Sequence, residues 1–263
     1  MKKYLLTFVL LFAFALFGCD ENIFESFSDD DTKQAKLEEA RIALDDEDYE
    51  KALALLEDLD QCDPDVATYL SSAYMGMANF NALDLVTNAE ELADDDDAGS
   101  IELISSVLDE DGDGQITLTE ITNGIQEAVN AIDAVTRLSG SCSESLTCDE
   151  EIILGVAGAL HATYMVLQLI QEDLGVSPIP VTEEGINAAY ETHDFDTGVV
   201  SDEELLALNT SMGYMSNAID CMTKDDKDNE LAENFEEFQQ EIGYGDGQID
   251  RNDLANYIDS IGD

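Results

Sequence analysis

The sequence predicts an all-α protein, built as a bundle or array of helices. Apolar residues recur at the three- and four-residue spacing of helices over most of the 263 residues, and no segment shows the sustained alternation of a strand. The only β-structure that we expect is a short two-strand bridge between paired loops. Although the formal net charge is −51, 44% of the residues are hydrophobic, which is enough to build a buried core.

The N-terminus carries a targeting pattern. Two lysines precede an uninterrupted apolar run, which ends at Leu16-Phe-Gly-Cys19. This stretch resembles a bacterial lipoprotein signal, in which a small residue before the cysteine permits cleavage and the thiol takes the lipid. The resemblance implies a signal peptide over 1–18, a lipid on Cys19, an acidic tether over 19–34, and a chain anchored to a membrane of the cell envelope, facing the periplasm or the cell exterior. An ordinary secretory signal or an N-terminal membrane anchor is the alternative.

Residues 35–92 have the pattern of helical hairpins. Five positions resemble the second helix of a tetratricopeptide repeat: Tyr49, Ala52, Leu56, Leu59 and Pro64. In that family the small residue lets two helices cross closely and the proline begins the next helix. The resemblance implies a docking face for a protein partner, which an apolar concave patch around Tyr69, Tyr74 and Phe80 would favour. An ordinary helical hairpin explains the same residues.

An acidic run over 93–99, with four consecutive aspartates, is the best internal boundary. It predicts a linker between the N-terminal hairpins and a helical domain over 100–263. A solvated loop inside one domain is equally consistent with it.

A loop-forming pattern follows a short helix predicted over 100–108. Asp109, Asp111 and Asp113 alternate along the chain, Gly114 follows, and an acid closes the pattern at Glu120. A hard cation of the size of calcium takes about seven oxygens, and alternate residues of a curled loop can direct their carboxylates at one centre. Glycine allows the sharp turn that a side chain would oppose.

This stretch resembles the EF-hand calcium loop. The resemblance implies Ca²⁺ as the bound ion, held by the three aspartates, a backbone carbonyl from Gln115, a direct or water-mediated oxygen from Thr117, and both carboxylate oxygens of Glu120. It also implies that Ile116 packs inward and pairs its backbone with a partner loop. The alternative is an acidic turn without a metal.

Two further segments are similar to this loop. The letters of Gly112-Asp-Gly-Gln-Ile116 recur as Gly245-Asp-Gly-Gln-Ile249, but the first two aspartates are replaced by Ile242 and Tyr244. We therefore expect a weaker second site or a purely structural partner of the first loop. Its candidate ligands are Asp246, Gln248, Asp250 and Asp253. The third segment, 194–204, is similar to the same loop with one residue deleted, and an acidic turn that caps a helix is its alternative.

The remaining helices are predicted from spacing and breaks. One leaves the first loop and runs to about Leu138, and a Ser/Gly loop follows over 139–148. Residues 152–170 carry no charge, and this segment is long enough to span a bilayer. However, polar residues interrupt the segment and no basic residue flanks it. We interpret it as the central buried helix, with His161 as a core histidine. Further helices are expected over 183–190, 202–223, 229–242 and 250–261.

Of the five cysteines, four are left after Cys19: Cys62, Cys142, Cys148 and Cys221. An even number in an exported chain predicts two disulfides, with three possible connectivities. Four unrelated buried thiols are the alternative.

Composition excludes some functions. So strong a negative charge opposes the binding of nucleic acid and of anionic lipid headgroups. It is consistent with adaptation to salt or with calcium buffering by the surface. The sequence shows no catalytic motif, no glycine-rich phosphate loop and no evident small-molecule substrate, so we expect no enzyme.

The sequence thus predicts a lipid-anchored calcium-binding protein of the cell envelope that acts as a binding or scaffold module. Two alternatives remain open: a calcium-stabilised surface protein without a specific partner, and a helical-repeat subunit of an envelope transport or assembly complex.

Overall fold

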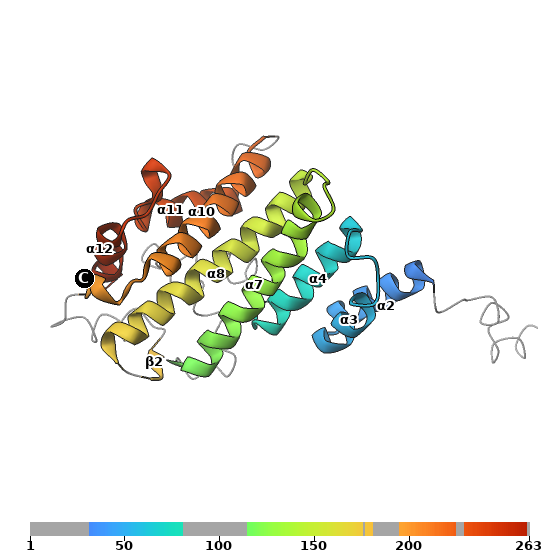
Figure 1. Ribbon diagram of the computed structural model, residues 1–263, viewed down its shortest axis with the longest axis horizontal. Coiled ribbons are helices and arrows are strands. Elements are labelled where there is room, and N and C mark those ends of the chain that lie inside the picture. The colour runs from blue at the N-terminus through green and yellow to red at the C-terminus, as the bar shows by residue number, and fades with distance from the viewer. Residues whose placement is uncertain (1–31, 81–114, 176, 181–194, 225–228, 262–263) are drawn as a thin grey trace, which may run out of the picture.

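The computed structural model describes residues 32–80, 115–175, 177–180, 195–224 and 229–261. Over these residues the chain is all-α, as predicted, apart from one short strand pair. The helices lie side by side as an array (Figure 1). The array has α8 (Cys148–Leu174) at its centre, between α7 (Leu118–Gly140) and α10 (Asp202–Met222).

The outer helices extend this array at both ends. On the α7 side lie α4 (Pro64–Met77), α3 (Tyr49–Leu56) and α2 (Lys33–Asp45). On the α10 side lie α11 (Glu230–Glu241) and α12 (Arg251–Ile261). The predicted helices over 202–223, 229–242 and 250–261 are therefore confirmed, whereas those over 100–108 and 183–190 lie outside the described residues.

The central helix is the uncharged segment of the sequence. Cys148–Leu174 is the one helix within the described ranges that is long and apolar enough to cross a membrane, with a mean hydropathy of 1.7 over the apolar window. However, 72% of that window is buried inside the fold, because α7 and α10 cover opposite sides of the helix. The interpretation of 152–170 as the central buried helix is confirmed.

Glycines bring the neighbouring helices close to α8. A Cβ added at Gly155 would lie 2.3 Å from the Cβ of Ala218, and one added at Gly158 would lie 2.9 Å from the backbone oxygen of Ser211. Both distances are too short for a real Cβ, so α8 and α10 approach to backbone contact there. On the other side, the ring of Tyr164 fills the space beside Gly124 of α7.

The side chain of Tyr164 extends beyond α7, and its hydroxyl donates a hydrogen bond of 2.6 Å to the carbonyl of Ala78, just after α4. The same core contains Met75 and Phe80 together with residues of α7, α8 and α10. The predicted boundary at 93–99 lies outside the described residues, and the helices on either side of it share one core.

The N-terminal helices pack through small residues. Ala43, Ala52 and Ala73 are buried where α2, α3 and α4 meet. The ring of Tyr49 occupies the space where Gly76 would carry a side chain. Ala52 thus permits the expected close packing, and Pro64 begins α4 after the N-cap Asp63.

The cysteines form two disulfides, as predicted, and the structure selects one of the three connectivities. Cys62, between α3 and α4, pairs with Cys142, just after α7. Cys148, at the start of α8, pairs with Cys221, near the end of α10. Each disulfide therefore joins two elements that are distant in sequence, and each restricts the unfolded chain.

We predict that Gly158→Ala lowers the free energy of unfolding by about 1–3 kcal/mol, because the added methyl group would push α8 from the backbone of α10. Gly213→Ala is the matched control within α10, since a Cβ there meets nothing within 4 Å. We expect it to raise stability by about 0.5–1 kcal/mol through helix propensity. Urea unfolding measures both, and equal effects of the two variants would contradict this packing.

Candidate metal centre

The second half of the first loop is described, and the structure places it at the start of α7. Its aspartates, Asp109, Asp111 and Asp113, lie outside the described residues. Ile116 is fully buried and belongs to the main core. Gln115 and Ile116 form the strand β1. The expected inward packing of Ile116 is therefore confirmed.

The strand partner of Ile116 is not the one predicted. β1 pairs antiparallel with β2 (Ile179–Pro180), in the register Ile116 to Ile179. The expected bridge to the second loop is wrong, because the corresponding residue of that loop, Ile249, has a different partner. Asn209 of α10 accepts a hydrogen bond from Ile249 N at 2.7 Å and donates one to Ile249 O at 3.0 Å. A side-chain amide offers the same donor and acceptor as a peptide group, so it replaces the missing strand.

Thr117 and Glu120 form a reciprocal cap at the start of α7. The Thr117 hydroxyl accepts from Glu120 N at 3.3 Å, and a Glu120 carboxylate oxygen accepts from Thr117 N at 2.6 Å. A carboxylate in the first turn of a helix also interacts favourably with the helix dipole. The cap fixes the position of Glu120 in the first turn of α7.

The second loop uses its last two acids in the same way. The Asp250 carboxylate accepts from the backbone N of Asn252 and Asp253, and the Asp253 carboxylate accepts from Asp250 N. Hydrogen bonds from these backbone groups lower the pKa of Asp250 below its usual value. Gly243 and Gly247 adopt left-handed φ angles of 85° and 86°, which turn the chain sharply on both sides of Tyr244–Asp246.

No group of three or more His, Cys, Asp or Glu side chains that could hold a metal is found in the part of the chain that the structure describes. In the second loop, Asp250 and Asp253 lie together as a helix cap, and the side chain of Asp246 lies outside what the structure describes. Gln248 lies on the surface.

The third segment is a helix-capping turn over its described part. Ser201 and Glu204 form a capping box at the start of α10, and the Asp196 carboxylate accepts from Gly198 N at 2.9 Å. Arg251 donates to the carbonyl of Val200 and forms an ion pair with Asp202. The second loop therefore lies beside the third segment.

The three segments share one construction. Each has a buried apolar residue, then a capping residue, then an acid three positions later; the sets are Ile116-Thr117-Glu120, Val200-Ser201-Glu204 and Ile249-Asp250-Asp253. The apolar residue anchors the loop in the core and the cap starts the following helix. Only the first loop adds three alternating aspartates in its first half.

Sequence reasoning missed the partners of the loops, Asn209 and Arg251. Both are half-buried polar residues of helices, and their sequence neighbours give no signal for a contact 40 to 51 residues away. The contacts of these two side chains with the loops become evident only when the packing of the helices is known.

His161 is a core histidine, as predicted. It is buried in α8, and its Nδ1 lies 2.8 Å from the hydroxyl of Ser211 in α10. Burial lowers its pKa from 6.5 to about 4, because the charged ring would lose hydration. The second histidine, His193, lies outside the described residues.

The patch considered for docking is not exposed. Phe80 is buried in the main core, and Tyr69 and Tyr74 are partly buried against the N-terminal helices. Burial also raises the pKa of Tyr74. Large apolar residues exposed among the described positions are Ile42, Leu118 and Leu206, each on a different helix.

Comparison of this chain with protein-family models, with curated proteins and with solved structures found no match.

We predict that His161 stays neutral until the pH approaches 4. The unfolded chain takes up this proton near pH 6.5, so between pH 6.5 and about 4 unfolding gains a proton. Stability should then decrease as the pH falls, by about 1.4 kcal/mol for each pH unit. Proton NMR of the two histidine rings measures the pKa directly.

His161→Gln assigns the resonance and should remove this part of the pH dependence, whereas His193→Gln should leave it in place. A His161 pKa near 6.5 in the folded protein would contradict the buried environment.

Proposed function

We propose that the protein binds calcium in the loop over 109–120 and acts as a lipid-anchored binding or scaffold protein of the bacterial cell envelope. The arrangement of the second half of the loop, with its buried isoleucine and its capping glutamate, supports this proposal most. Ile116 is fully buried and paired with β2, and Glu120 is held at the first turn of α7. An EF-hand-like loop needs this anchoring, because its last ligand must meet ligands from the first half at one point.

The capped state of Glu120 is compatible with metal binding. One carboxylate oxygen accepts from Thr117 N in the structure. Calcium would draw the carboxylate toward the cation and use both oxygens, while the helix dipole favours the negative charge at this position either way. The acids at 109, 111 and 113 repel one another without a cation, so the ion stabilises the loop by neutralising them.

Two properties support a place outside the cytoplasm. Both disulfides join distant elements, and such bonds persist in oxidising compartments. The stretch before Cys19 is similar to a lipoprotein signal. The negative charge of the chain opposes its binding to anionic lipid headgroups. A lipid on Cys19 would hold the chain at the membrane despite this repulsion.

A calcium-stabilised structural protein without a specific partner is the second candidate. The exposed large apolar residues of the described ranges are on three different helices, and they form no common docking face on a single element. This distribution favours the structural role over a helical-repeat docking role.

We predict that calcium at a hundredfold excess over its dissociation constant stabilises the mature soluble chain by about 2.7 kcal/mol. The melting temperature should then rise by about 5–10 °C. The measurement is thermal unfolding in calcium against chelator, at one high ionic strength that screens general charge effects.

Glu120→Gln should abolish most of this gain and lower stability in chelator by no more than about 1 kcal/mol, the value of its charge at the helix N-terminus. Glutamine still accepts the hydrogen bond from Thr117 N, so the cap remains while the charged two-oxygen ligand is lost. Glu150→Gln is the matched control, because Glu150 accepts from Thr147 N in the same way and no alternating aspartates precede it. Equal calcium responses of both variants and the parent chain would refute a site in this loop.

The lipid anchor gives a separate prediction. Cys19→Ser should leave a precursor that retains residues 1–18 or a soluble chain, as measured by membrane fractionation and mass spectrometry. A chain of parent size in the membrane fraction after this substitution would contradict lipidation at Cys19.

A further inference from the structure

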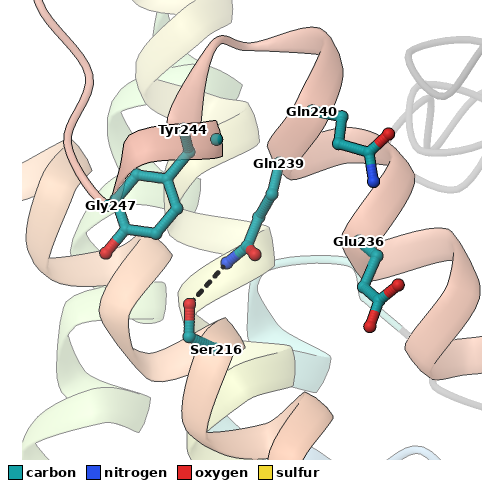
Figure 2. A pocket seen from close by; sticks show the side chains of 7 residues that line it. Ser216, Glu236, Gln239, Gln240, Tyr244 and Gly247 are labelled. Atoms are coloured by element: carbon teal, nitrogen blue, oxygen red, sulfur yellow. Dashed lines mark hydrogen bonds between the residues drawn. The ribbon is translucent and has the colours of Figure 1, made fainter.

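A small pocket lies where the second loop meets α10 and α11 (Figure 2). Its volume is about 310 Å³, at the lower end of the range for ligand pockets. The lining residues are Ser216 of α10, Glu236, Gln239 and Gln240 of α11, and Tyr244, Gly245 and Gly247 of the loop. The wall is thus built from three elements, and none of its residues is among the predicted metal ligands.

Two glycines line the loop side of the pocket. A Cβ at Gly245 or at Gly247 would meet nothing within 4 Å. Gly247 is required by its φ of 86°, but Gly245 has no such angle. Neither close packing nor a left-handed φ requires glycine at position 245, so a larger side chain can be placed in this wall of the pocket.

The polar groups of the pocket are held in place. The Gln239 amide nitrogen donates to the carbonyl of Met212 at 2.8 Å and to the hydroxyl of Ser216 at 3.0 Å. These two bonds use both amide hydrogens and fix the amide plane, so the carbonyl oxygen is an oriented acceptor. Figure 2 shows this amide between the ring of Tyr244 on one side and the side chains of Glu236 and Gln240 on the other.

The charge of the lining selects the class of ligand. No lysine, arginine or histidine lines the pocket, and Glu236 is its one charged residue, so an anion has no partner there. The Gln239 amide hydrogens and the Ser216 hydroxyl hydrogen are used within the protein, since Ser216 donates to the carbonyl of Met212 at 3.1 Å. The Gln239 carbonyl oxygen can accept from a ligand, and the Gln240 amide and the Tyr244 phenol can both donate and accept, which matches ligand hydroxyl groups that also do both. The aromatic ring offers an apolar surface to the carbon skeleton of a ligand.

We propose that this pocket binds one unit of a neutral, hydroxyl-rich ligand of monosaccharide size. A single carboxylate cannot form the acid and base pair that hydrolyses a glycosidic bond, so the pocket binds a sugar without cleaving it. This function is independent of the calcium loop and gives a chain in the cell envelope a way to contact glycans.

The test is saturation-transfer NMR on the mature soluble chain, with glucose, galactose and N-acetylglucosamine as probes and spermidine as a cationic comparison. All samples contain chelator, so that the result does not depend on the calcium proposal. At least one sugar should receive saturation from the protein, and spermidine should not displace it.

Gly245→Leu should abolish the sugar signal, because the new side chain fills the pocket. Gly140→Leu is the matched control, since a Cβ there also meets nothing within 4 Å but Gly140 does not line the pocket. Gln240→Leu provides a second loss of signal should the loop variant not fold. Absence of binding for all three sugars, displacement of the sugar by spermidine, or an undiminished signal in both pocket variants would overturn the proposal.

Discussion

The fold depends on a helix that carries no charge along its middle in a chain that is otherwise densely acidic. Acidic side chains outnumber basic ones 61 to 10, so bringing helices together concentrates like charge unless an apolar element separates them. The helix α8 is that element. The glycines at 155 and 158 let α10 reach backbone contact with it, and Tyr164 extends its contacts across α7 to the end of α4. Most of the acids that the structure describes are exposed or half-buried on the outside of the array, whereas Glu150 is buried.

The same acids also start the helices. Glu120, Glu150, Glu204 and Asp253 each accept a hydrogen bond from the backbone N of the residue three positions before it. A carboxylate there pairs with an otherwise unbonded N–H group and with the positive end of the helix dipole. Three of these caps follow a loop with a buried apolar residue, so one local construction positions three turns. For the proposed calcium site, the first half of such a loop would supply further oxygens, and three alternating aspartates precede Gly114 in the sequence.

The helices could largely be predicted from patterns of neighbouring residues, but the contacts between the helices could not. The uncharged run at 152–170 and the three C-terminal helices were predictable because helical spacing and caps are properties of neighbouring residues. The even cysteine number predicted two disulfides, but Cys62 with Cys142 could be selected only after the helices were packed. The repeated Gly-Asp-Gly-Gln-Ile letters suggested that Ile116 and Ile249 pair. In the fold Ile116 pairs with Ile179, and Ile249 hydrogen-bonds to Asn209. A backbone N–H and C=O need an acceptor and a donor, and several kinds of residue can supply them. The pocket beside Tyr244 left no signal in the sequence, because its wall comes from three separate elements.

If calcium binds the first loop, the ion and the fold around Ile116 should stabilise each other. Amide hydrogen exchange of the mature chain, with calcium and with chelator, measures this residue by residue. We expect calcium to slow exchange at Gln115, Ile116 and the first turn of α7, and also at Ile179 in the partner strand, while amides in the middle of α10 stay unchanged. Equal exchange at Ile116 and Ile179 in the two conditions would contradict it.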